Sequence, residues 1–309
     1  MLKRLKGRAG VGQAQPSKRS VRGWAATAGV IGVSLSMLGH AAEWSDTSIG
    51  WRYGTKFAEP YETNDISKNI LNLTHVSGYK YGTNFFNVDM LYSDNKDPSA
   101  IGSTNGAQEV YIVYRNTVDI GKVTGKEYKL GIVKDIGVTF GFDTNTKTDT
   151  GYNSKKRMLV AGPTVMIDVP GFLNVSLLEL WESNAPSGWN FNSIPPGTYS
   201  IPRYSYKTHP MLTAAWGIPI GSSAFSFEGF MNYIASKGKD EFGADTKPET
   251  DFDGQIMADV GMLTGGPKGT FKLGLEYQYW KNKFGNDASG PAGSGAFAKT
   301  PMIRAEYHF

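Results

Sequence analysis

The chain has 309 residues, of which 40% are hydrophobic and 19% are charged, and it contains no cysteine. This is the composition of a folded protein, and the lack of cysteine excludes disulfides, thiolate metal sites and a cysteine nucleophile. The 38 Gly and the 16 each of Tyr and Phe favour strands and turns over helices.

The first 41 residues have the pattern of a secretory signal peptide. Seven Lys and Arg and no acid precede residue 23, an uncharged and mostly apolar run of sixteen residues follows, and small residues predict cleavage after Ala41. An uncleaved anchor helix is the alternative, but a bilayer span needs roughly 20 residues. Without this segment the chain carries 25 basic and 28 acidic residues, so its formal charge is no evidence for a nucleic-acid partner.

Residues 42–309 show a period-two alternation of apolar and polar residues, which is typical of strands with one apolar face. In 136–142, for example, Ile136, Val138, Phe140 and Phe142 alternate with smaller or polar residues. A pair of adjacent leucines, Leu177 and Leu178, breaks the pattern and predicts a bulge. Twelve strands are predicted, near 47–57, 69–77, 84–93, 107–116, 128–142, 158–168, 172–182, 208–218, 224–235, 252–263, 270–281 and 300–309.

The connections between these strands alternate between short turns and long polar loops, and the short-side link between the fourth and fifth strands is longer than its counterparts. Such alternation is typical of transmembrane barrels, which have two unlike rims and an even number of strands. A soluble two-sheet sandwich is the alternative, because its strands also alternate. The sequence favours an all-β protein, a closed antiparallel up-and-down transmembrane β-barrel of about 12 strands over 42–309, integral to a Gram-negative outer membrane.

Aromatic residues cluster at strand ends and at the C-terminus, as at the two membrane interfaces of such barrels. The C-terminal alternation ends at Phe309, and barrel closure requires this strand to pair with the first one. It resembles the terminal strand of bacterial outer-membrane proteins, which implies recognition by the assembly machinery. The candidate interfacial aromatic residues are Trp44, Tyr92, Tyr114, Tyr152, Trp181, Tyr233, Tyr279 and Tyr307, and for any single one packing in the core or in a loop is an equal alternative.

If the apolar residues of each strand face lipid, the residues that alternate with them line the lumen. This second set carries both positive and negative charges. That mixture predicts either a narrow polar passage or a lumen closed by ion pairs. Rings beside charged groups suit a solute that is part aromatic and part hydroxylated. The predicted lumen and substrate-binding residues are Arg52, Lys56, Phe57, Tyr61, Asp89, Glu109, Tyr111, Arg115, Glu228, Asp259, Glu276 and Arg304.

Segments such as WRYGTKFAEPY at 51–61, FFNVDMLYSDNKDP at 85–98 and AQEVYIVYR at 107–115 carry a family resemblance. Together with 167–184, they resemble the Tsx-type nucleoside-specific channels of Gram-negative outer membranes. The resemblance implies a twelve-stranded monomeric barrel that passes nucleosides. It matches Lys56 and Phe57 to a basic–aromatic pair, and Glu109 and Arg115 to an acidic–basic pair. The long connection at 183–207 departs from the family.

The sequence therefore favours a passive channel for small polar solutes, with nucleosides as the preferred solutes and outer-membrane lipid as its surroundings. A non-conducting structural or adhesive barrel is one alternative. A lipid-modifying barrel enzyme is the other, but no histidine stands in a recognisable nucleophile motif. We expect no catalytic residue, no metal and no cofactor.

Overall fold

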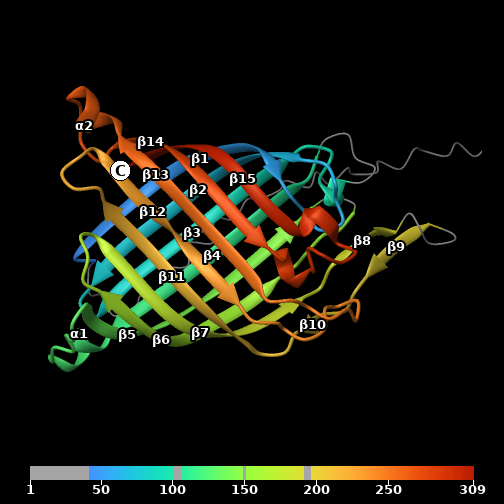
Figure 1. Ribbon diagram of the computed structural model, residues 1–309, viewed down its shortest axis with the longest axis horizontal. Coiled ribbons are helices and arrows are strands. Elements are labelled where there is room, and N and C mark those ends of the chain that lie inside the picture. Colours follow the sequence, from blue (N-terminus) through green and yellow to red (C-terminus); the bar gives the residue numbers. More distant parts are fainter. Residues whose placement is uncertain (1–41, 101–105, 149–150, 191–195) are drawn as a thin grey trace, which may run out of the picture. The chain divides into compact units, whose positions relative to one another are not determined.

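The computed structural model describes residues 42–100, 106–148, 151–190 and 196–309. The predicted signal peptide lies outside these residues. The described chain confirms the predicted fold, because antiparallel strands pair in chain order around a closed ring (Figure 1). The twelve barrel strands are β1 (Trp44–Phe57), β2 (Ile66–Tyr79), β3 (Gly82–Ser93), β4 (Gln108–Asp119), β5 (Val133–Lys147), β6 (Arg157–Ile167), β7 (Phe172–Asn184), β11 (His209–Pro219), β12 (Phe225–Ile234), β13 (Glu249–Asp259), β14 (Phe271–Lys281) and β15 (Phe297–His308).

The ring closes where the last strand pairs with the first. The ladder between β1 and β15 runs from Ser48 opposite His308 to Tyr53 opposite Ile303. The backbone N–H of Phe309 adds a hydrogen bond of 2.9 Å to the carbonyl oxygen of Thr47. Because lipid offers no hydrogen bonds to a backbone, a sheet without free edges is the form of β-structure that can cross it.

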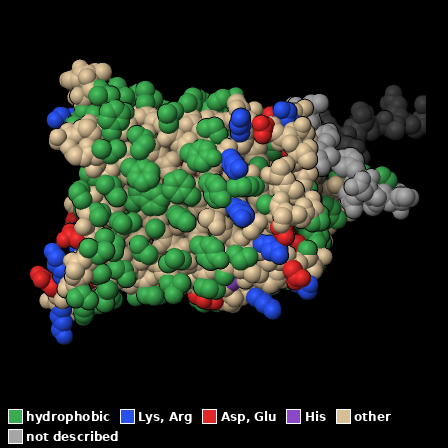
Figure 2. All heavy atoms as spheres, in the orientation of Figure 1, with side chains coloured by type: hydrophobic (Ala, Val, Ile, Leu, Met, Phe, Trp, Pro, Cys, Tyr) green, Lys and Arg blue, Asp and Glu red, His purple; other side chains and the backbone are tan. Residues whose placement is uncertain are grey.

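The outer surface of the barrel is mostly apolar, and Figure 2 shows a broad hydrophobic area over the strands. Leu275 is 69% exposed and Leu159 is 60% exposed, both from the parity predicted to face lipid. Trp44, Trp181, Tyr233 and Tyr307, which lie near strand ends, are also exposed. No helix among the described residues is long and apolar enough to cross a membrane.

Two helical turns stand at the end of the barrel that carries the short connections and the C-terminus (Figure 1). They are α1 (Ile120–Thr124) and α2 (Val260–Thr264), and their sequences with flanking residues are DIGKVTG and DVGMLTG. Asp119 and Asp259 cap them by accepting hydrogen bonds from the N–H groups of Lys122 and Met262. The predictions of strand at 128–132 and at 260–263 are wrong, since 260–263 belong to α2 and 128–132 lie in the connection between α1 and β5.

The chain departs from regular alternation at a different place from the predicted one. β7 contains no bulge: Leu177 is exposed on the outside and Leu178 is buried on the inside. One irregularity lies in β1, where the register to β2 shifts between Gly54 and Phe57, and another lies at the start of β5, where the register to β6 shifts between Val133 and Asp135. A bulge puts one extra residue into a strand, so Phe57 faces inward, although strict alternation from Tyr53 would turn it outward.

The long connections at the opposite end contain short elements of their own. η1 (Pro98–Ala100) lies between β3 and β4, while η2 (Lys283–Gly285) and η3 (Gly293–Ala296) lie between β14 and β15. The connection from β7 to β11 holds the hairpin of β8 (Ser187–Asn190) with β9 (Gly197–Ser200), and β10 (Tyr204–Ser205), which pairs with β7. These segments bring polar residues to one mouth of the barrel.

Candidate functional site: the barrel lumen

Four predicted lumen residues meet in one buried ion-pair network. Arg52 contacts Asp89 at 2.6 Å and Glu276 at 3.1 Å, and Arg304 contacts the same Glu276 at 2.8 Å and Glu306 at 2.5 Å. The Glu276 side chain is completely buried between the two guanidinium groups. Strand alternation explains the meeting, because β1, β14 and β15 are neighbours and these residues share the inward parity.

A second network is formed where the long connections fold over the strand ends. Glu59, from the connection after β1, contacts Lys68 of β2 at 2.6 Å and Lys283 of η2 at 3.2 Å. Asp97 contacts Lys68 at 3.5 Å, and Lys147 of β5 lies within 3.9 Å of both carboxylates. All five side chains are buried, so the network ties three connections to the barrel wall.

The charges of this second network determine the protonation of its loop carboxylates. Burial by itself would raise the pKa of Glu59, but the attraction of Lys147, Lys283 and Lys68 outweighs it and holds this pKa well below its ordinary value. Burial by itself would also raise the pKa of Asp97. The attraction of Lys68 and Lys147 outweighs burial, so this pKa is lowered as well. Both groups are therefore ionised at neutral pH.

A third cluster surrounds Glu182 near the end of β7. Lys237 contacts this carboxylate at 3.1 Å and Lys156 at 3.8 Å, and the Nε2 atom of buried His209 lies 3.8 Å away. The other ring nitrogen of His209 bonds to the carbonyl oxygen of Lys207 at 2.8 Å. His209 thus belongs to a structural ion cluster.

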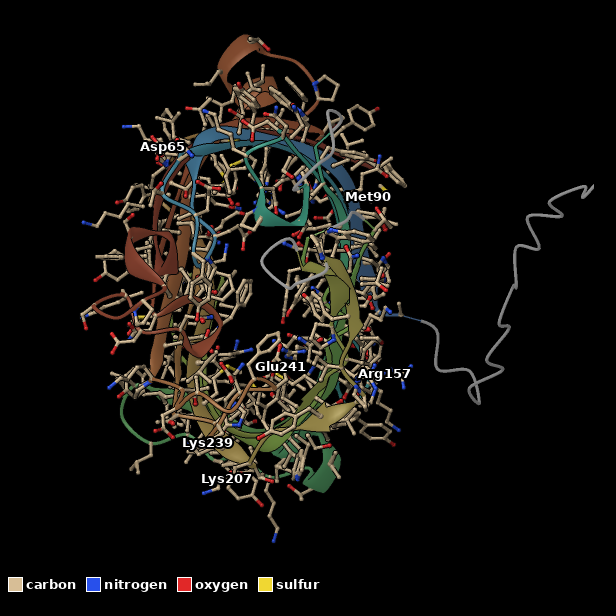
Figure 3. All side chains as sticks on the ribbon, turned by 90° about the vertical axis from the view of Figure 1, so that its right-hand side faces the viewer. Asp65, Met90, Arg157, Lys207, Lys239 and Glu241 are labelled. Atoms are coloured by element: carbon tan, nitrogen blue, oxygen red, sulfur yellow. The ribbon has the colours of Figure 1, made fainter. Side chains whose placement is uncertain are left out.

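The connection between β12 and β13 adds an acid to this mouth of the barrel. In Figure 3, Glu241 lies within the ring of strands, whereas Met90 and Arg157 lie at its outer rim. Glu241 accepts hydrogen bonds from the hydroxyl groups of Tyr152 and Tyr206. Burial and the neighbouring Glu241 raise the pKa of both tyrosines. Of the two alternatives for Tyr152, the outer interface and packing in a loop, this contact supports the second.

Two aromatic rings point inward and remain accessible. Phe85 of β3 and Phe230 of β12 are each 37% exposed, although they share the parity of the buried lumen residues. Phe85 is the register partner of Arg115, which forms an ion pair of 2.5 Å with Asp143. Strand alternation turns both positions inward, but only the structure distinguishes these rings from inward residues that are buried.

Another partly exposed group of polar side chains lies on the wall of β12 and β14. Glu228 contacts Lys272 at 3.3 Å, and the side chains are 24% and 23% exposed. On the facing part of the sheet, predicted lumen residue Tyr111 donates a hydrogen bond of 3.2 Å to Asp143, and Glu109 contacts Lys147 at 3.5 Å. The predicted residues on strands β4, β12 and β14 therefore do line the interior.

Three of the predicted lumen residues lie elsewhere, and a fourth, Phe57, faces the interior but is buried. Lys56 is exposed on the outside, because the bulge in β1 turns it away from the interior. Phe57 points inward but is only 4% exposed, since it packs in an apolar cluster with Ile66. Tyr61 is 67% exposed in a connection. Asp259 caps α2 at the short-connection rim and accepts hydrogen bonds from Met262 and Gly269.

Several important interior residues were missed from the sequence. Lys68 and Lys147 lie on β2 and β5, but beyond the ends of the strands predicted at 69–77 and 128–142, so a longer strand prediction was needed to find them. Three others, Glu59, Asp97 and Lys283, come from connections. A pattern of alternating residues cannot predict that a connection folds inward. Apolar residues also line part of the interior, in one cluster formed by Met158, Val160, Leu178, Leu180 and Met211.

No protein-family model and no curated protein matches the sequence. Among solved structures, the KdgM porin is 10% identical, with a TM-score of 0.40 over 85% of this chain and 99% of that one. The translocator domain of autotransporter NalP from Neisseria meningitidis is 13% identical, with a TM-score of 0.45 over 89% and 91% of the two chains. The NanC porin is 12% identical, with a TM-score of 0.36 over 85% and 99%. A Tsx-type channel is not among these structures.

Proposed function

We propose that the protein is an integral outer-membrane barrel through which small polar solutes diffuse passively. The observation that carries this proposal is the exposure of Phe85 and Phe230, which point inward but remain 37% accessible. A filled interior would bury such rings, as it buries Phe57. Partial exposure of the ion pair between Glu228 and Lys272 supports a water-filled space on the same grounds.

Nucleosides are the solutes that we propose for this passage. Stacking of a base on an aromatic ring contributes about 1–3 kcal/mol, which is enough to select a solute and weak enough to release it. Arg115, Asp143, Glu228 and Lys272 offer charged hydrogen-bonding groups near the two rings for sugar hydroxyls. This preference rests on side-chain chemistry and on the family resemblance of the sequence.

Liposome swelling tests the proposal. Vesicles that contain the folded protein should swell faster in adenosine or thymidine than in a neutral disaccharide of similar size. Equal rates for all of these solutes would support a general channel and contradict the nucleoside preference. Vesicles with inactive, heat-unfolded protein provide the baseline for passive leakage.

A non-conducting barrel is the second candidate, and the buried network around Glu59 is the observation that favours it. Three connections meet there over the strand ends, and the ion pairs hold them together. If swelling is absent for every solute while the barrel remains folded, the interior is closed and this second function replaces the first. Folding is checked by the change in electrophoretic mobility on heating.

A further inference from the structure

Three lysines of adjacent strands form a row on the outside of the barrel, which we call the lysine row. Lys281 ends β14, Lys299 lies on β15, and Lys56 lies in the bulge of β1; all three are exposed. Lys299 is two residues from the register partner of Lys281, and Thr300 donates a hydrogen bond of 2.8 Å to the carbonyl oxygen of Lys56. The three residues therefore lie side by side.

Figure 2 shows Lys and Arg side chains in a line where the hydrophobic surface meets the end with the long connections. Within the described residues, none of the three lysines of the row makes an ion pair with a carboxylate. The acids of their strands share the inward parity: Glu276 and Glu306 pair with Arg304, and Asp46 contacts His308. The row is therefore a group of exposed cations without counter-charges of their own.

A cavity of about 430 Å³ adjoins one end of the lysine row. Lys281 and Lys247 supply two cations to it, and Asp287 supplies one acid that pairs with Lys247 at 3.6 Å. One lysine is thus left without a carboxylate partner among the described residues. The residues that line this cavity are Lys247, Lys281, Asn282, Asp287, Ala288 and Ser289.

Directly toward the barrel middle on the same strands, the outer surface is apolar. Leu275 and Tyr277 precede Lys281 on β14, and Ile303 follows Lys299 on β15; all three of these apolar side chains are exposed. A ligand that fits both regions must have hydrocarbon chains that cover the apolar surface and anionic groups that contact the lysine row. A free anion would contact only the lysine row and the adjoining cavity.

We propose that the lysine row and the adjoining cavity bind the phosphorylated headgroup of an outer-leaflet lipid, whose acyl chains cover the apolar surface below. Cations at a membrane surface attract anionic headgroups, and each one adds to the affinity. The proposal depends on the outer-membrane placement proposed above. It does not depend on conduction, because the row lies outside the lumen.

Native mass spectrometry of the full chain in detergent tests this site. The probe is bisphosphorylated lipid A, and the comparison probe is the same lipid after removal of both phosphates. The test variant combines Lys56→Gln, Lys281→Gln and Lys299→Gln. The control variant combines Lys122→Gln, Lys126→Gln and Lys134→Gln, which removes the same charge from exposed residues near the opposite rim.

We expect the wild-type and control proteins to retain the phosphorylated lipid, and the test variant to bind it on the order of a hundredfold more weakly. We expect the dephosphorylated lipid to bind all three proteins equally weakly, and millimolar inorganic phosphate not to displace the bound lipid. Equal binding by test and control variants would overturn the proposal, as would equal binding of the two lipids. Displacement by inorganic phosphate would also overturn it, in favour of a free-anion site. Vesicle swelling by the test variant should match wild type, which separates this result from failure of the proposed channel.

Discussion

Phe85 and Phe230 lie on opposite walls of the barrel, because five strands separate β3 from β12 in either direction around the ring. Both rings point inward and are equally exposed, at 37%. Phe85 lies beside the ion pair of Arg115 and Asp143, and Phe230 is two residues from Glu228. The lumen thus presents an aromatic face and charged groups on each side of its interior.

Replacement of either ring should weaken the interaction with nucleosides. We expect Phe85→Leu and Phe230→Leu each to reduce nucleoside block of single-channel current about fivefold to tenfold, because a stacking contact of about 1–3 kcal/mol is lost. The matched control is Phe86→Leu, which changes the neighbouring ring of the same strand on its outward face. Equal loss of block in this control would assign the effect to folding.

The carboxylate of Glu276 should be essential for stability. Glu276→Gln removes the charge shared by Arg52 and Arg304 and leaves each guanidinium group with one carboxylate partner. Because these groups are buried, we expect the free energy of unfolding in urea to fall by about 3 kcal/mol. The control is Glu228→Gln at a partly exposed pair, where a loss below about 1 kcal/mol is expected. Equal losses at both sites would show that burial does not determine the effect.

Acid should release the loop network around Glu59 and Asp97. Both pKa values are lowered in the folded protein, so the folded state binds fewer protons than the unfolded state. The stabilisation is complete above the ordinary carboxyl pKa values of 4.5 and 3.8 and is lost as pH falls through the lowered values. A nitroxide on Lys96→Cys should stay immobile from pH 8 to pH 5 and gain mobility only in stronger acid. The same label on Lys126→Cys is the control, and a transition centred between pH 6 and pH 8 would contradict the assignment.

The reassignment of Asp259 from lumen to helix cap leads to a further prediction. Asp259→Ala should lower the free energy of unfolding, because the N–H group of Met262 loses its acceptor. Conductance and nucleoside block should remain at wild-type values, since the carboxylate serves α2. Asp119→Ala, at the equivalent cap of α1, should behave in the same way. If conductance changed in Asp259→Ala but not in Asp119→Ala, Asp259 would have to line the passage, which would contradict its assignment as a helix cap.

Strand number, order and facing were accessible to sequence reasoning because alternation is a local property. Arg52, Glu276 and Arg304 were placed inside from parity alone, and the register brings them together. The prediction from alternation was wrong at Lys56, because one extra residue in β1 reverses which face of the sheet each following residue of the strand occupies. Gly54, at which the shift begins, is of a residue type that often marks a bulge within a strand.

The connections were the least predictable part of the site. Glu59, Asp97 and Lys283 meet because their connections fold inward over buried lysines, and that arrangement depends on contacts between distant segments. The two helical turns are different, because their repeated pattern was readable. A capping Asp, a Gly two residues later and a final Thr-Gly recur at 119–125 and 259–265.

The central claim is that one parity of the strands meets water inside the barrel while the other meets lipid. Single nitroxides placed in turn at residues 85 to 90 of β3 in reconstituted vesicles test it, and the absence of native cysteine makes each label unique. The account predicts that labels at 85, 87 and 89 collide with a water-soluble nickel complex, and that labels at 86, 88 and 90 collide with oxygen dissolved in lipid. Labels at 85, 87 and 89 that the nickel complex cannot reach in the folded barrel would contradict it.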